Sequence, residues 1–197
     1  MIALLRYLRS IHPLSESLRD HLEDMLKEKR LARTDYLVKP GQICGNIYYI
    51  EKGLLRTYYN KGGKEISSGF MKEGEFCMAR ESFFSQQYTQ EGIEALEDTL
   101  VYYISYQDLQ QIYQKFIEFN YIGRTLQERC HLSAIQRWQT FWMQSAENRY
   151  NWLIANFPDL VQRVPGKYLA SYLGMTPQML SIIRGRKQLA QRNQHAY

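Results

Sequence analysis

Residues 164–187, VPGKYLASYLGMTPQMLSIIRGRK, contain two short helical patterns separated by a turn at Gly174. Apolar side chains recur at helical spacing in both patterns: Leu169, Ala170 and Leu173 in the first, Leu180 and Ile183 in the second. Gly174 tolerates the left-handed backbone conformation that ends a helix, and Ala170 is small where two helices must cross closely. The stretch therefore predicts two packed helices joined by a tight turn.

The residues after the turn are suited to starting the second helix. Met175 supplies an apolar side chain at the corner, and the Thr176 hydroxyl can cap the helix. Pro177 fits the first helical position, because its missing N–H costs nothing there. This combination is typical of a DNA-binding helix-turn-helix. The alternative is an ordinary pair of helices within an all-helical domain.

The charge of the C-terminal region favours a polyanionic partner. No Asp or Glu follows Asp159, whereas this region contains the basic residues Arg163, Lys167, Arg184, Arg186, Lys187 and Arg192. The formal net charge of the whole chain is only +5, so the basic excess is concentrated here. Because affinity for DNA comes largely from cations that displace counterions from phosphates, we expect DNA as the partner. Charge alone would equally fit a solubilising basic tail.

The second helix of the motif has one face that is free to read bases. At 100° per residue from the inward-facing Leu180, Gln178 lies at about 160°, Ile182 at about 200° and Ser181 at the side. The Gln178 amide can pair with adenine, and Ile182 offers an apolar surface to a thymine methyl group. We therefore predict that Gln178, Ser181 and Ile182 read bases. Phosphates are expected to be held by Lys167, Thr176, Arg184, Arg186 and Lys187.

The N-terminal half of the chain changes its periodicity once. Residues 3–27 have a helical pattern, in which Ser15 can cap a segment with Leu18 and Leu22 on one face. From about Lys29 the pattern changes to short runs rich in Tyr, Ile and Thr. Turn signals follow at residues 40–41, 52–53, 60–63 and 73–74, which is the texture of a β-sandwich or barrel. A short helix and loop are expected within residues 77–90.

The segment from about 116 to 144 predicts one long helix, because it lacks Pro and has a single Gly. It far exceeds the average helix of about 11 residues, and a small barrel cannot cover all of it. We expect it to form a dimer seam through Phe119, Ile122, Leu126, Arg129 and Ser133. The alternative is an ordinary helix packed against its own domain. The domains are then residues 1–115, 116–144 and 145–197.

The composition of the chain limits which cellular compartment and which structural class of protein it fits. With 45% hydrophobic residues the 197-residue chain is ordinary globular protein, and no apolar run reaches the roughly 20 residues that span a bilayer. The N-terminal stretch has arginines within its apolar run and does not fit a secretion signal. Cys44, Cys77 and Cys130 fit neither a disulfide framework nor a metal knuckle. We expect a cytoplasmic protein with free thiols that does not bind membranes.

Three stretches, LVKPGQICGNIYYIEKGLLRTYY, KEGEF followed by EALEDTLVYYIS, and YLASYLGMTPQMLSIIR, together resemble the Crp–Fnr family of bacterial transcription regulators. The last resembles the subgroup found in Bacteroidetes-type bacteria. The resemblance implies an α+β fold: N-terminal helices and a β-roll (a jelly roll like cyclic-nucleotide-binding domains), a long dimerisation helix and a C-terminal helix-turn-helix domain. It also implies that the β-roll senses a small effector and that the chain forms a homodimer. RNA polymerase is a possible further partner.

The expected effector pocket departs from the members that bind cyclic AMP. Their Gly-Glu pair falls here at Met78-Ala79, and their phosphate-gripping Arg-Ser pair at about Thr89-Gln90. A buried phosphate without a cation is poorly stabilised. Arg80 is the one nearby cation, and a different local alignment with the family would place it at the phosphate. The expected pocket comprises Gly74, Glu75, Phe76, Met78, Arg80, Thr89 and Gln90, and its effector is unidentified.

No cofactor, metal or catalytic residue is expected. The cysteine cluster of iron–sulfur members is absent, and no histidine lies between His21 and His131 to ligate haem or a cupin-type metal. The remaining histidines are His12 and His195. No Ser-His-Asp order, phosphate loop or zinc spacing appears either. The sequence therefore predicts a dimeric DNA-binding transcriptional regulator. The alternative is a ligand-binding regulatory module that acts through protein contacts without DNA.

Overall fold

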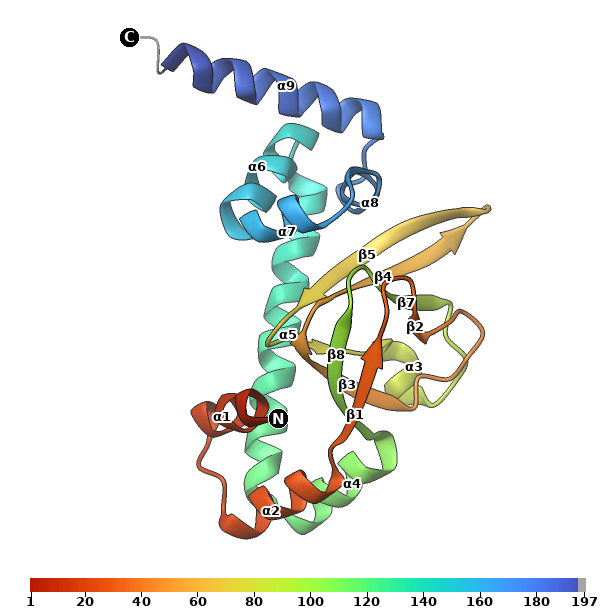
Figure 1. Cartoon of the computed structure of the whole chain (residues 1–197), viewed down its shortest axis with the longest axis vertical. Coiled ribbons are helices and arrows are strands. Elements are labelled where there is room, and N and C mark those ends of the chain that lie inside the picture. The colour runs from red at the N-terminus through yellow and green to blue at the C-terminus, as the bar shows by residue number, and fades with distance from the viewer. Residues whose placement is uncertain (195–197) are drawn as a thin grey trace.

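The chain begins with two helices, α1 (Ile2–Ile11) and α2 (Glu16–Met25), in a computed structural model that describes residues 1–194 (Figure 1). The side chains of Trp142, Gln188, Ala190 and residues 191–194 are not described. His195, named above, lies outside the described residues. The helical pattern over residues 3–27 thus forms two helices, because Pro13 disfavours helical backbone at His12, which is extended. The Ser15 hydroxyl caps α2 by accepting the Leu18 N–H at 3.2 Å, as predicted.

Between residues 27 and 105, eight strands form two antiparallel sheets of four strands each. One sheet has the order β1 (Lys27–Leu31), β8 (Thr99–Ser105), β3 (Asn46–Lys52), β6 (Phe76–Cys77). The other has the order β2 (Tyr36–Val38), β7 (Glu91–Ala95), β4 (Leu54–Lys61), β5 (Lys64–Lys72). Opposed residues set the register, with Tyr48 facing Tyr103 in the first sheet and Thr57 facing Ile93 in the second. The turn signals thus correctly predicted a β-sandwich or barrel, and the β-roll implied by the resemblance is present.

Helices cover the ends of the β-roll and one side of it (Figure 1). The short helix α3 (Arg80–Ser85) lies between β6 and β7. A capping box formed by Ser105 and Asp108 starts α4 (Tyr106–Lys115) directly after β8. The 27-residue helix α5 (Ile117–Met143) then runs along the molecule from the N-terminal helices to the C-terminal ones. The sequence predicts one long helix here, and α5 links the N-terminal part of the molecule to the C-terminal helices.

The C-terminal helices form a second unit on α5. They are α6 (Ala146–Asn156), α7 (Pro158–Arg163), α8 (Gly166–Tyr172) and α9 (Pro177–Gln194). Gly174 adopts a left-handed φ of 64° between α8 and α9, and the Thr176 hydroxyl accepts the Met179 N–H at 3.2 Å. The turn and the cap thus form as the sequence predicts. We call α6–α9 the helix-turn-helix unit.

Two apolar cores hold the chain together. The first lies inside the β-roll and extends to α1, α2, α4 and the beginning of α5. The second lies within the helix-turn-helix unit and includes Leu54, Phe70 and Leu96 of the β-roll. The helix-turn-helix unit therefore packs directly against the sheet that contains β4 and β5. Within residues 1–194, no helix has both the length and the apolar content needed to cross a membrane.

Candidate functional site

The outer face of α9 is free of intramolecular packing at the positions predicted to read bases. Gln178, Ser181 and Ile182 are exposed, and the Ile182 side chain is 56% exposed. Leu180 and Ile183 are buried in the second core, against the apolar side chains of α8. The helix therefore has the inward and outward faces that the 100° spacing predicts, while base reading itself stays a prediction.

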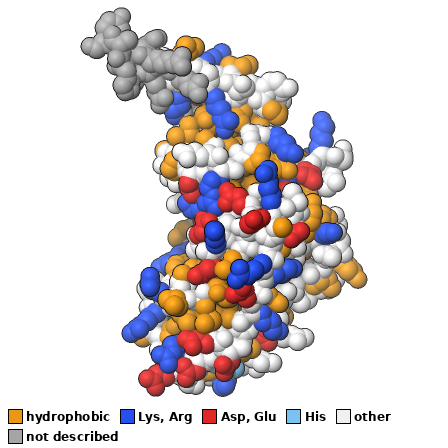
Figure 2. All heavy atoms as spheres, in the orientation of Figure 1, with side chains coloured by type: hydrophobic (Ala, Val, Ile, Leu, Met, Phe, Trp, Pro, Cys, Tyr) orange, Lys and Arg blue, Asp and Glu red, His pale blue; other side chains and the backbone are white. Residues whose placement is uncertain are grey.

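The residues predicted to hold phosphates divide into two sets. Lys167, Thr176 and Arg186 are exposed. Arg184 and Lys187 are half-buried: Arg184 Nε donates to the Tyr150 hydroxyl at 3.1 Å, and Lys187 Nζ donates to Asn151 Oδ1 at 2.9 Å. Both partners belong to α6, so these two basic side chains also hold α9 against α6. Figure 2 shows Lys and Arg side chains on the C-terminal helices, with the acidic side chains gathered lower on this face.

A cavity of about 420 Å³ lies between the second sheet, α3, α5 and the helix-turn-helix unit. Four residues of the predicted effector pocket line it, namely Glu75, Phe76, Met78 and Arg80. Gly74, Thr89 and Gln90 do not line this cavity, so their place in an effector pocket stays a prediction. Gly74 sits in a turn with a φ of 85°, where its N–H donates to the Ile50 carbonyl. Thr89 is tied by its backbone to Gly41 and Gln42.

The floor of this cavity is a chain of polar groups on the second sheet. The hydroxyls of Thr57 and Ser68 are 2.7 Å apart, and Ser68 donates to the Glu91 carboxylate at 2.8 Å. Burial raises the pKa of Glu91, although these hydroxyls oppose the shift. Burial also raises the pKa of Glu75, and the backbone N–H of Lys72 opposes it through a 3.0 Å hydrogen bond. Both carboxyl groups can therefore bind hydrogen-bond donors of a ligand.

Helix α5 contributes cations to the cavity that were not predicted there. Arg129, Ser133 and Arg137 line it, four residues apart, on one face of the helix. Arg129 and Ser133 were assigned to the dimer seam, and Arg137 was missed. Their spacing of four was the available signal, but the sequence does not indicate which neighbour covers that face. Burial raises the pKa of the Tyr172 hydroxyl in α8, and the nearby Arg137 guanidinium opposes this through charge and a hydrogen bond.

The predicted dimer stripe of α5 packs largely within its own chain. Phe119 and Ile122 are buried in the first core, and Leu126 packs against it. Helices α1 and α4 contact α5 here, whereas Arg129 and Ser133 of the predicted stripe are exposed. The dimer seam itself stays a prediction. The opposite face bears exposed apolar residues instead: Tyr121 (46% exposed), Leu132 (59%) and Ile135 (39%).

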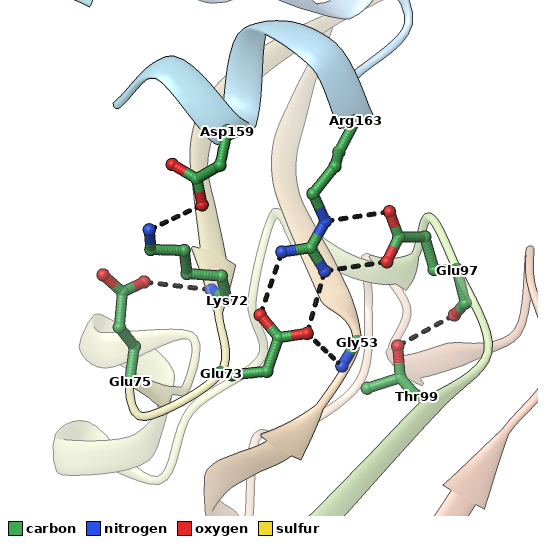
Figure 3. A network of polar contacts seen from close by, with 8 residues as sticks. All are labelled: Gly53, Lys72, Glu73, Glu75, Glu97, Thr99, Asp159 and Arg163. Atoms are coloured by element: carbon green, nitrogen blue, oxygen red, sulfur yellow. Dashed lines mark hydrogen bonds and ion pairs between the residues drawn. The ribbon is translucent and has the colours of Figure 1, made fainter. Parts of the chain in front are cut away.

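Ion pairs join the β-roll to the helix-turn-helix unit (Figure 3). Arg163, the last residue of α7, donates to both oxygens of Glu73 at 2.9 Å and to Glu97 at 3.0 and 2.7 Å. The hydrogen bonds that Arg163 donates to Glu97, and then those to Glu73, raise the pKa of Arg163. We call Arg163, Glu73 and Glu97 the interdomain clamp. Beside it, Lys72 Nζ lies 2.6 Å from Asp159 Oδ2.

A family model called "cyclic nucleotide-binding domain" matches residues 28–116, which include all of the β-roll except Lys27. No curated protein matches the chain. A crystal structure of a putative regulator of the crp/fnr family from Eubacterium rectale has a TM-score of 0.72 and 16% identity, over 94% of this chain and 88% of that one.

Two further solved structures have the same architecture. A mutant of CooA from Carboxydothermus hydrogenoformans has a TM-score of 0.68 and 18% identity, over 89% of this chain and 80% of that one. The c-di-GMP responsive regulator CLP from Xanthomonas campestris has a TM-score of 0.67 and 18% identity, over 89% of this chain and 93% of that one. At these identities the likeness establishes the fold.

Proposed function

We propose that this protein is a cytoplasmic transcriptional regulator of the Crp–Fnr type, in its Bacteroidetes-type subgroup, that binds DNA as a homodimer. Its parts would be an effector-sensing domain (residues 1–115), a dimerisation helix (116–144) and a DNA-binding domain (145–197). The observation that carries the proposal is the outer face of α9. Gln178, Ser181 and Ile182 are exposed there, on a helix-turn-helix that has no acidic residue after Asp159.

The DNA contacts follow from this face. In the proposed complex α9 enters the major groove, where the Gln178 amide pairs with adenine and Ile182 contacts a thymine methyl group. Lys167, Thr176 and Arg186 are exposed and would reach phosphates. Arg184 and Lys187 would add positive charge while they hold α9 to α6.

A second copy of the chain would cover the exposed face of α5. Tyr121, Leu132 and Ile135 fall within about 40° of one line along the helix, at 100° per residue. An uncovered apolar stripe of this kind is unfavourable in water, whereas two such helices can bury it against each other. The dimer would then present two α9 helices to half-sites one DNA turn, about 34 Å, apart.

The cavity would hold a small effector. Its wall combines carboxylates (Glu75, Glu91), arginines (Arg80, Arg129, Arg137) and aromatic rings, so it suits a ligand with both hydrogen-bonding groups and an apolar part. RNA polymerase is a further proposed partner, reached when the dimer is bound upstream of a gene.

Selection of binding sites from random double-stranded DNA tests this proposal. Full-length protein should enrich a near-palindrome with half-sites about 10 base pairs apart, centre to centre. Binding without any sequence preference, or no binding at low salt, would contradict it. The second of these outcomes would favour the alternative, a ligand-binding module that acts through protein contacts alone.

A further inference from the structure

The turn formed by residues 72–75 faces two functional parts of the molecule at once. On one side, the Glu75 side chain lines the cavity. On the other side, Lys72 and Glu73 contact α7 of the helix-turn-helix unit, and Figure 3 shows these contacts side by side. A four-residue segment therefore contacts both the cavity and the unit proposed to bind DNA, which also contributes part of the cavity wall.

The cavity side of this turn is held by Glu75 itself. Its Oε2 accepts the backbone N–H of Lys72 at 3.0 Å, and its backbone N–H donates to the Lys72 carbonyl at 3.1 Å. The turn is also paired to β3: the Gly74 N–H donates to the Ile50 carbonyl at 2.9 Å, and the Ile50 N–H donates to the Glu75 carbonyl at 3.0 Å. A group that binds Oε2 of Glu75 therefore competes with the Lys72 N–H that shapes the turn.

The other side of the turn is held by charge-assisted bonds. Glu73 accepts two bonds from the Arg163 guanidinium, and its Oε1 also accepts the Gly53 N–H at 2.8 Å. Bidentate bonds between arginine and a carboxylate fix orientation as well as distance. Lys72 adds its ion pair with Asp159, at the beginning of α7. Both ends of α7 are thus tied to the same turn.

Helix α7 in turn is fixed to the helix that precedes the DNA-reading one. It ends at Arg163, and α8 begins at Gly166, two residues after the buried Val164. Leu160 of α7 and Leu169 of α8 are buried in the same core. A displacement of α7 therefore moves α8, and α9 moves with it.

We propose that residues 72–75 are the element through which occupancy of the cavity sets the orientation of the helix-turn-helix unit. This inference rests on the proposed function, in which the cavity holds an effector and α9 binds DNA. A ligand that donates a hydrogen bond to Oε2 of Glu75 displaces the Lys72 N–H, relaxes the turn and shifts the clamp between Glu73 and Arg163. The clamped arrangement leaves Gln178, Ser181 and Ile182 exposed, so the clamp orients the DNA-reading face rather than covering it.

The test uses a double-mutant cycle on the full-length protein, with DNA affinity measured on the selected operator. Arg163→Gln should weaken DNA binding about tenfold, and Glu75→Ala about threefold. Either change loosens the helix-turn-helix unit, which must keep one orientation to bind both half-sites. If both act through the turn, the double variant should stay near tenfold rather than near the thirtyfold expected of independent sites. The matched control is Arg19→Gln, which breaks the exposed Arg19–Asp20 pair on α2 and should leave affinity unchanged.

Hydrogen exchange without DNA supplies a second measurement. Both single variants should raise amide exchange in α7 and α8, while exchange in β1 and β8, which pair with each other, stays at the wild-type rate. The unchanged rate in these strands also shows that the fold persists. Glu73→Gln keeps the side-chain shape and should reproduce the effect of Arg163→Gln. A double variant in which the two effects multiply, or a Glu75→Ala variant with wild-type exchange in α7, would overturn the inference. If the wild-type protein binds no DNA, the proposed function fails, and the exchange measurement alone decides whether the turn couples the two parts.

Discussion

The guanidinium carbon of Arg56 lies 3.8 Å from the centre of the Tyr168 ring, so strand β4 meets helix α8 through a buried cation. Arg56 is 0% exposed. Its Nη1 donates to Glu65 at 2.8 Å and to Glu94 at 2.7 Å, and its Nε donates to Ser67 at 2.9 Å. Within the described residues its Nη2 has no hydrogen-bond partner. The position of the helix-turn-helix unit on the β-roll thus depends on charge as well as on apolar packing.

Arg56→Met should destabilise the protein by about 3–5 kcal/mol, because Glu94, which is only 6% exposed, would keep a buried charge without its cation. The free energy of unfolding from urea denaturation measures this. Arg30→Met is the matched control, since the Arg30 side chain is 79% exposed and its loss should change stability by no more than about 0.5 kcal/mol. Equal effects of the two substitutions would contradict the prediction.

The interdomain clamp should make stability depend on pH. Burial alone raises the pKa of the Glu73 carboxyl, but hydrogen bonds from Arg163 and backbone N–H groups outweigh it and lower the pKa from 4.5 to about 2. A carboxyl group with a lowered pKa stabilises the folded state fully above its unfolded pKa, and this stabilisation is lost as the pH falls from 4.5 towards 2.

Melting temperatures of the wild type and Glu73→Gln, measured from pH 6 to pH 3, test this dependence. The wild type should exceed the variant at pH 6, and the difference should shrink below pH 4.5. Since the Glu73 side chain is 39% exposed, salt should also reduce the difference. A difference that is the same at every pH would show that the Glu73 charge does not contribute.

Leu132→Glu with Ile135→Glu should convert the proposed homodimer into monomers without unfolding them. Both side chains are exposed in the single chain, so charge there is tolerated until a second helix must bury it. Sedimentation equilibrium should give twice the 23.5 kDa chain mass for the wild type and 23.5 kDa for the variant. Tyr88→Glu is the control, because this residue is 73% exposed and lies outside α5. Leu126→Glu should instead destabilise the fold, because Leu126 packs against the first core.

Two substitutions should separate base reading from phosphate binding. Gln178→Ala should cost about 1–3 kcal/mol on the selected operator and relax the preference at one base pair per half-site. Arg186→Ala should weaken binding to all sequences alike and reduce the salt dependence by about one unit per contact. Operator selection with each variant is the measurement. A Gln178→Ala variant that keeps the wild-type preference at every position would contradict the assignment.

Cyclic AMP should not bind in the manner typical of the family. Met78 and Ala79 stand where the resemblance expects a Gly-Glu pair, and Ala79 is buried at the start of α3, where it carries no carboxylate. Calorimetric titration with cyclic AMP up to about a millimolar, where binding is worth only about −4 kcal/mol, should show no heat beyond dilution. A micromolar constant that Arg80→Ala abolishes would instead show that Arg80 takes the phosphate.

The local parts of the fold could be predicted because their causes lie a few residues apart. Gly174 ends α8, the Thr176 hydroxyl caps α9, and turn signals separate the strands, all through interactions between near neighbours in the chain. The inward and outward faces of α9 follow from helical geometry alone. The helix-turn-helix and the β-roll were therefore determined by the sequence itself.

Only the tertiary structure decided which surfaces of the helices and strands pack against each other. Helical periodicity marks a stripe on α5, but it does not tell whether α1 and α4 or a second chain will cover Phe119 and Ile122. Arg137 and Glu75 line the same cavity although they are far apart in the sequence. Arg163 binds Glu73, which lies 90 residues before it. Such contacts depend on how the cores bring distant segments together, because the energy of an ion pair is set by the final distance and burial of its two charges, which local patterns do not encode.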